Sequence, residues 1–305
     1  MADVNDRLLV FVGQIGLPPH ATGGGFDHGD VHLSSGRVFV AHTANGTVDV
    51  IDGERMTRVQ SVPGCPEGSG VLVAGDLVFA ASRGSGELLV IDALSCEAVR
   101  RVRVGPRPNG LAWDPGLGNV LVADVETFDA RLIEASTGAL VGLSKLPGRP
   151  RWCIYDAPRR RFLVNIREPA CVVALAAESL REVARIDRLA AGPHGLDVDH
   201  ARDRAFVACD AGEVVVLDLA TDHEIARVPI AGEPDAIWYS LAADSLYVAI
   251  GSPGLVSVVD CTSLEVVQEL ETEEAAHTTA YDSQRQRLYV FASRSCAALV
   301  YEEKR

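Results

Sequence analysis

The stretch HGLDVDHARDRAFVACDAGEVVVLDLATDHEIARVPIAG, residues 194–232, contains four short apolar runs separated by turn-forming residues. These runs are HGLDVD (194–199), RAFVACD (204–210), GEVVVLD (212–218) and HEIARVPIAG (223–232). Short runs rich in valine that are bounded by Gly, Pro and Asp are typical of strands rather than helices. The stretch therefore predicts four short antiparallel strands joined by turns.

The third of these runs recurs along the whole chain. VDVID, LLVID, ARLIE, VVVLD, VSVVD and ALVYE end at Asp52, Asp92, Glu134, Asp218, Asp260 and Glu302, with spacings of 40, 42, 84, 42 and 42 residues. The double spacing contains a degenerate copy, CVVALAA, with Ala176 at the expected position. A four-stranded sheet of this size cannot bury both faces alone, whereas radial stacking of such sheets buries them. We therefore predict an all-β fold, a seven-bladed β-propeller of four-stranded antiparallel blades.

The two ends of the chain indicate how the ring closes. The last unit starts near residue 277 and supplies only three strands, while RLLVFVGQIG (7–16) is left over at the start. A strand from residues 7–16 would complete the last blade and protect its open edge. We expect one propeller domain over residues 1–305, closed by its N-terminal strand.

Composition excludes several partner classes. The formal net charge of −14 disfavours nucleic acid and acidic membrane surfaces, which attract basic faces. No apolar run approaches the roughly 18 residues that a membrane helix needs. The seven cysteines are scattered without a CxxC pair, so a reduced, cytoplasmic location is the simplest expectation. The sequence leaves monomer and dimer open.

Three segments resemble YVTN-type propeller repeats of the surface-layer and quinoprotein-like kind. They are RVFVAHTANGTVDVID (37–52), RAFVACDAGEVVVLDLATDHEIARVPIAGEPDAI (204–237) and SLYVAIGSPGLVSVVDCTSLEVV (245–267). The resemblance implies the propeller fold over nearly the whole chain. It leaves function open, because related seven-bladed rings include lactonases, lyases, metalloenzymes and scaffolds.

The segments that enter the innermost strands place one residue per blade at the mouth of the central channel. Aligning DHGDVHL, PEGSGVL, PNGLAWD, PRWCIYD, PHGLDVD, PDAIWYS and AHTTAYD gives His28, Glu67, Asn109, Arg151, His194, Asp235 and His277 in blade order. The second of these positions is ambiguous by one or two residues, because the hairpin that follows it is short. The alignment predicts that His28, His194 and His277, each at the start of an innermost strand, converge at one mouth of the channel.

Because the last blade touches the first, His194, Asp235, His277 and His28 occupy four consecutive blades, with Glu67 next. Three imidazoles and a carboxylate suit a divalent transition metal such as Fe, Cu, Zn, Ni or Mn. We therefore predict a mononuclear metal site formed by these four residues. The alternative is a polar rim that water solvates.

Three further features lie near this arc. His32 and His42, like Glu67, are possible extra ligands, although a hydrogen-bonded core histidine explains His32 and a loop residue explains His42. The insertion LPPHATGGGFD (17–27) is either a mobile lid or a plain flexible connection.

Across the predicted mouth from the histidines, the residues are arginines and an asparagine. Asn109, Arg151 and Arg167 would bind an anionic or carboxylate-bearing small molecule, since arginine recognises carboxylates through paired donors. Alternatively, the arginines pair with Asp124 or Asp210 across the rim. Trp152 and Trp238 follow mouth positions and are expected to pack between blades.

The favoured function is therefore a metal-dependent enzyme acting on a small anionic molecule. Its chemistry would be that of a lyase, hydrolase or isomerase using a Lewis acid, or oxygen activation if the metal is Fe or Cu. Asp235 would be the fourth ligand or general base, and Arg151 the substrate anchor. Two alternatives stay open: a non-catalytic protein-binding scaffold, and a metal-independent lactonase or lyase using Arg151, His194 and Glu67.

Overall fold

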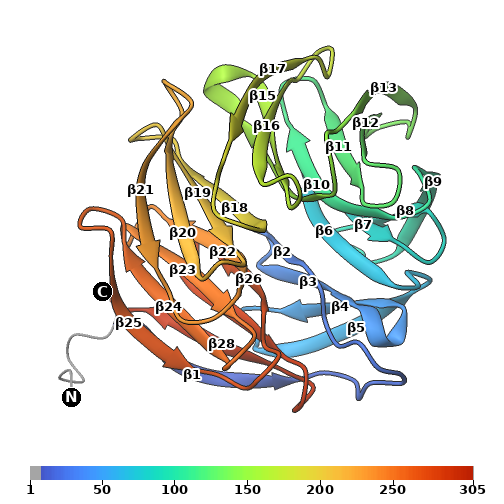
Figure 1. Cartoon of the computed structure of the whole chain (residues 1–305). Coiled ribbons are helices and arrows are strands. Elements are labelled where there is room, and N and C mark those ends of the chain that lie inside the picture. The colour runs from blue at the N-terminus through green and yellow to red at the C-terminus, as the bar shows by residue number, and fades with distance from the viewer. Residues whose placement is uncertain (1–7, 305) are drawn as a thin grey trace.

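The computed structural model describes residues 8–304, which form seven four-stranded antiparallel sheets set around a central axis (Figure 1). The prediction of an all-β, seven-bladed β-propeller is confirmed. Helical structure within these residues is limited to the 3-10 turns η2 (Thr43–Asn45) and η3 (Ala157–Arg159). Among the described residues, no helix is long and apolar enough to cross a membrane.

Each blade runs from an innermost strand outward in chain order, except the last. Blade one comprises β2 (Gly29–His32), β3 (Arg37–His42), β4 (Thr47–Asp52) and β5 (Thr57–Pro63). Blade two comprises β6 (Gly68–Ala74), β7 (Leu77–Ser82), β8 (Glu87–Asp92) and β9 (Ala98–Arg103). Blade three comprises β10 (Pro108–Asp114), β11 (Asn119–Asp124), β12 (Asp129–Glu134) and β13 (Leu140–Lys145).

The remaining blades repeat this order. Blade four comprises β14 (Pro150–Asp156), β15 (Arg161–Ile166), β16 (Cys171–Ala176) and β17 (Glu182–Asp187). Blade five comprises β18 (Pro193–Asp199), β19 (Arg204–Cys209), β20 (Glu213–Asp218) and β21 (His223–Pro229). Blade six comprises β22 (Pro234–Ser240), β23 (Ser245–Ile250), β24 (Leu255–Asp260) and β25 (Glu265–Glu271). Blade seven comprises β26 (Thr278–Asp282), β27 (Arg287–Ala292), β28 (Ala297–Glu303) and β1 (Leu9–Gly16).

The N-terminal strand closes the ring, as the sequence predicts. β1 pairs antiparallel with β28, with Leu9 opposite Glu303 and Gly16 opposite Ala297. Position 7 of the expected strand lies outside the described residues. The amide side chain of Gln268 in blade six accepts hydrogen bonds from the Leu8 and Leu9 N–H groups and donates one to the Leu9 carbonyl (2.9–3.0 Å). These bonds fix the register of the closing strand.

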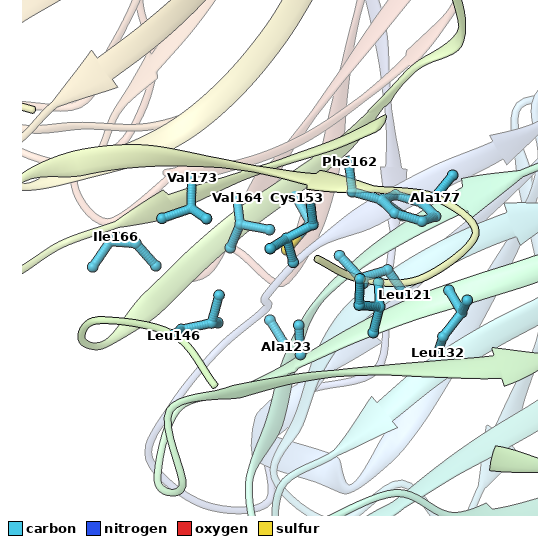
Figure 2. Packing of buried hydrophobic residues seen from close by; sticks show 14 of the residues in the cluster. Leu121, Ala123, Leu132, Leu146, Cys153, Phe162, Val164, Ile166, Val173 and Ala177 are labelled. Carbon is cyan, nitrogen blue, oxygen red and sulfur yellow. The ribbon is translucent and has the colours of Figure 1, made fainter. Parts of the chain in front are cut away.

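Apolar layers between neighbouring blades form the core. Figure 2 shows Leu121 and Leu132 of blade three facing Phe162, Val164 and other side chains of blade four, all fully or almost fully buried. Because the central strands of each blade are covered on both faces, their sequences are continuous apolar runs rather than alternating ones. This explains why the repeat is visible in the third strand of every unit.

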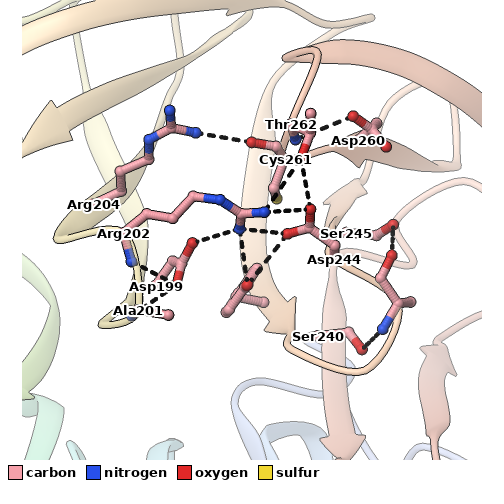
Figure 3. Close-up of polar contacts among 12 residues, drawn as sticks. Asp199, Ala201, Arg202, Arg204, Ser240, Asp244, Ser245, Asp260, Cys261 and Thr262 are labelled. Carbon is pink, nitrogen blue, oxygen red and sulfur yellow. Dashed lines mark hydrogen bonds and ion pairs between the residues drawn. The ribbon is translucent and has the colours of Figure 1, made fainter.

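Polar links join the hairpins of adjacent blades. The Arg202 guanidinium after β18 binds Asp244 of blade six through two parallel bonds of 2.6 Å and also contacts Asp199 at 2.9 Å (Figure 3). Arg204 donates to the Cys261 carbonyl at 2.8 Å. Paired arginine–carboxylate bonds fix geometry as well as adding energy. They hold blades five and six in register at this rim.

Some innermost strands approach one another so closely that three positions require glycine: Gly70, Gly110 and Gly195. A Cβ atom on Gly70 would lie 2.0 Å from the Asn109 carbonyl oxygen of the next blade, and a Cβ on Gly195 would lie 2.1 Å from the Asp235 carbonyl oxygen. These distances are far below van der Waals contact. The residue before each such glycine is thereby held at the start of its strand, at the channel mouth.

We predict that Gly195→Ala lowers the free energy of unfolding by about 3 kcal/mol or more, because the new methyl group overlaps a neighbouring backbone oxygen. Gly16→Ala is the matched control, since no heavy atom lies within 4 Å of the place that its new methyl group would occupy. It should change stability by less than about 0.5 kcal/mol. Equal effects of the two substitutions in urea unfolding would contradict the proposed close approach.

Candidate functional site at the channel mouth

Hairpin registers define which residues are equivalent at the mouth. Asp30, Leu72 and Asp197 each lie opposite the same position of the second strand, occupied by Phe39, Phe79 and Phe206. Counting back from these pairs gives one residue per blade, which we call the mouth ring: Asp27, Ser69, Asn109, Arg151, His194, Asp235 and His277.

The sequence alignment is therefore wrong in two blades. In blade one it selects His28 instead of Asp27. Counted from the hairpin pairs His32–Arg37 and Asp199–Arg204, Asp27 is equivalent to His194. Asp27 and His28 both bond to the backbone of Ala41. In blade two it selects Glu67, which precedes the ring position by two residues. His28 is displaced by one residue along its strand, toward the channel.

Imidazoles and carboxylates alternate along the mouth ring from blade five to blade one. Nδ1 of His277 donates to Asp235 Oδ2 at 2.7 Å, and Nε2 of His194 lies 3.1 Å from Asp235 Oδ1. His194 turns its other nitrogen, Nδ1, toward Asp210 Oδ1 at 3.3 Å. The structure thus brings together three of the four predicted ligands, as a hydrogen-bonded network centred on Asp235.

Charge coupling within this network shifts two pKa values in opposite directions. Burial of Asp235 opposes its ionisation, but His194 and His277 outweigh burial and hold the pKa of Asp235 well below its usual range. The hydrogen bond to Asp235 raises the pKa of His277 above that of an ordinary histidine, against the effect of burial. The pair is therefore stabilised as imidazolium and carboxylate.

His28 lies beside this network in a different environment. Its Nε2 is 3.3 Å from Asp27 Oδ1, and its ring stacks on Trp152 with centroids 4.3 Å apart. Burial lowers the pKa of His28, although the carboxylates of Asp27 and Asp235 act against that effect. Asp27 also binds the Arg83 guanidinium of blade two. His28 is thus held as a neutral imidazole at neutral pH.

The cationic side of the mouth contains one paired and one unpaired arginine. Arg167 binds Asp210 at 2.6 Å, which is the alternative pairing that the sequence left open. The Arg151 side chain makes no hydrogen bond or ion pair to any residue within 8–304, and its Nε is buried without a partner. Burial lowers the pKa of Arg151, and the neighbouring Arg149 and Arg167 add to this. Asn109 is buried in β10.

The three possible extra ligands lie apart from the network. Glu67 is exposed and pairs with Arg107 at 3.0 Å. His32 sits at the other end of its strand, where it contacts Ser35 and Asp76. His42 is completely buried and binds Asp49 at 2.7 Å. None of them contacts His194, Asp235 or His277.

The insertion at 17–27 is anchored to the blades. His20 Nε2 donates to the Ser293 carbonyl of blade seven at 2.6 Å, and its Nδ1 lies 2.7 Å from His42 Nε2. The Ala21 N–H donates to Asn45 at 2.6 Å. These contacts of His20 cannot be predicted from the sequence, because its partners are far away in the chain. The segment is a tethered cover over blade one rather than a free lid.

The mouth residues as they lie do not form a metal-ligand group. Among residues 8–304, no three His, Cys, Asp or Glu side chains are arranged to hold an ion together. Both ring nitrogens of His194 face carboxylates, and His28 is displaced from the ring. An ion would require these side chains to exchange their present hydrogen bonds for metal bonds, so metal binding stays a prediction.

Sequence reasoning also missed the residues that line the channel below the mouth. Trp152 and Trp238 pack against the apolar clusters between their blade and the next, as expected, and they also line a cavity in the channel. Trp152 can extend across the channel because the equivalent positions in three other blades are Gly70, Gly110 and Gly195. This signal is visible in the sequence once the register is known.

Comparison with known proteins supports the fold and nothing finer. No family model matches the chain, and no curated protein matches its sequence. A solved structure of Kuenenia stuttgartiensis hydrazine synthase is similar with a TM-score of 0.80 and 13% identity, covering 93% of this chain and 96% of that one. A chain in a crystal structure of the mitotic checkpoint complex is similar with a TM-score of 0.85 and 11% identity, covering 100% and 95%. Membership of the YVTN-type family stays a prediction.

The raised pKa of His277 predicts a pH-dependent contribution to stability. The contribution is complete below the unfolded-state pKa of about 6.5 and is lost as pH rises through the higher folded-state value. His277→Gln should therefore destabilise the protein more at about pH 5.5 than at about pH 9. His223→Gln, at an exposed outer-strand position, is the control and should have a small effect at both pH values. A loss that does not depend on pH would contradict the ion pair.

Proposed function

We propose that this chain is an enzyme that binds a small anionic molecule at the channel mouth and transfers protons on it without requiring a metal. The reaction would be of the lyase or lactone-hydrolase kind. The observation that carries this proposal is the Asp235-centred pair of histidines on the same mouth ring as the unpaired guanidinium of Arg151, which Asp235 influences electrostatically. A half-buried arginine without an anionic partner favours an anionic ligand.

His277 is suited to act as a general acid. Asp235 accepts a hydrogen bond from Nδ1–H and so fixes the ring, while no residue within 8–304 hydrogen-bonds to Nε2. A carboxylate behind a histidine orients it and stabilises its charged form, as in catalytic triads. Because the hydrogen bond to Asp235 raises its pKa, His277 keeps its proton to a higher pH than an ordinary histidine and can donate it from Nε2.

His28 is suited to act as the complementary base. Burial lowers its pKa, so it loses its proton at a lower pH than His277 does. Among the described residues, none hydrogen-bonds to its Nδ1. Two titratable groups whose pKa values are pushed apart identify an acid and a base. In an elimination, His28 would take the proton from carbon while His277 protonates the leaving oxygen. In lactone hydrolysis, His28 would take a proton from the attacking water, and His277 would protonate the ring oxygen.

The test uses protein without an affinity tag and two matched substrates, a carboxylate-bearing lactone and the neutral lactone with the same ring. Activity should survive chelation. It should rise with pH as His28 loses its proton and fall again as His277 loses its own, which gives a bell-shaped profile. His277→Gln should lower kcat by about 10²- to 10⁴-fold, whereas His223→Gln should not.

Arg151→Gln separates anchoring from chemistry. It should raise KM for the carboxylate-bearing lactone and leave KM for the neutral one unchanged, because only the former has an anion to bind. A failure of both lactones to bind or react would overturn the proposal and favour the scaffold alternative. Near-stoichiometric metal that is lost in His194→Ala, together with activity abolished by chelation, would favour the metal-dependent alternative instead.

A further inference from the structure

Below the mouth, the channel widens into a chamber of about 340 Å³. His28 and Trp152 lie at its mouth end, and the innermost strands of the blades form its wall. Most of the lining is apolar, but two carboxylates, Asp30 and Asp197, also face it. No lysine or arginine among the described residues lines the chamber.

One register of the innermost strands supplies the belt of this chamber. Counting from the hairpins, the members that line the chamber are Asp30, Leu72, Ala112, Ile154, Asp197 and Trp238. Ala280, at the same level of blade seven, is buried in the core instead. In the blades next to Asp30 and Asp197, the residues of this register are apolar. They therefore face a mostly apolar space and have no basic partner.

Backbone amides hold both carboxylates in one orientation. Asp30 accepts from the Val31 N–H and, through its other oxygen, from the Val73 N–H of blade two, both at 2.7 Å. Asp197 repeats this arrangement with Val198 at 2.8 Å and with Tyr239 of blade six at 2.6 Å. Each carboxylate uses one lone pair per oxygen in these bonds. The remaining lone pairs are available to a ligand.

The two carboxylates lack the countercharge that buried carboxylates normally have. Burial raises the pKa of Asp30 to about 6 and that of Asp197 to about 7, although the backbone N–H bonds act in the opposite direction. The cost of ionisation in the chamber is thus only partly offset by the protein. A cation in the chamber would remove the rest of that cost.

Aromatic side chains complete the wall. The indole rings of Trp152 and Trp238 are nearly perpendicular, at 83°, with centroids 6.1 Å apart, and Trp113 and Tyr155 also line the chamber. Trp238 donates its Nε1 proton to Thr279 at 3.1 Å, so this polar group is already satisfied. Perpendicular indoles form two adjacent walls, and aromatic faces attract organic cations.

We propose that this chamber binds an organic ammonium cation, held by Asp30 and Asp197 and walled by Trp152 and Trp238. The site is separate from the anion-binding mouth, because its charges are of the opposite sign and it lies below His28. A methylated ammonium group fits better than a metal ion, since the lining supplies apolar and aromatic surface around only two carboxylates.

The test compares choline with 3,3-dimethylbutan-1-ol, in which a carbon atom replaces the charged nitrogen. The probes have the same shape, so a difference in affinity measures the charge. Calorimetry and tryptophan fluorescence should show choline binding at least about tenfold more tightly than the neutral alcohol. This comparison uses the unaltered protein and does not depend on a variant that folds.

Asp197→Asn provides the second measurement, with Asp187→Asn at an exposed outer-strand position as the charge-matched control. The first should weaken choline binding at least about tenfold, and the second should not change it. Equal binding of the two probes, or no choline binding at about 10 mM, would overturn the proposal. Loss of choline binding in Arg151→Gln but not in Asp197→Asn would also overturn it, by placing the cation at the mouth.

Discussion

The structure depends on how closely seven innermost strands approach a common axis. At Gly70, Gly110 and Gly195 a neighbouring carbonyl oxygen lies about 2 Å from the place where a Cβ atom would stand. Only glycine allows this approach, and the resulting ring buries the apolar faces of all blades. In these three blades the same constraint holds the preceding residue, Ser69, Asn109 or His194, at the mouth. The fold thereby creates a ring of seven neighbouring side chains from segments about 42 residues apart.

The two chemically distinct regions of the channel follow from this geometry. At the mouth, consecutive blades supply His194, Asp235 and His277, whose mutual hydrogen bonds fix their orientation. One register further in, glycines in three blades leave space that Trp152 fills by extending to His28. The stacked rings of His28 and Trp152 lie between the charged mouth and the aromatic chamber. A change of one residue in register moves a side chain from one region to the other.

The repeat made the fold predictable, since a run such as VVVLD recurs with almost constant spacing. The mouth positions Arg151, His194, Asp235 and His277 were predictable from the turns before their strands. Blade one was misaligned because DHG (27–29) resembles PHG (193–195), whereas counting from the hairpins makes Asp27 equivalent to His194. Partners such as Asp210 for His194, or Ser293 for His20, could not be predicted because loops distant in the chain bring them together. The channel-facing role of Trp152 follows only when the glycine positions are known.

The most direct test of the central claim is the protonation of His277, followed by nitrogen-15 chemical shifts of its ring across pH. The account predicts a titration midpoint above that of an ordinary histidine. It also predicts that, once the ring has lost its charge at high pH, the remaining proton is on Nδ1, toward Asp235. Asp235→Asn should lower that midpoint, because the carboxylate charge that holds the proton is lost. A wild-type ring protonated on Nε2, with a midpoint that Asp235→Asn leaves unchanged, would contradict the account.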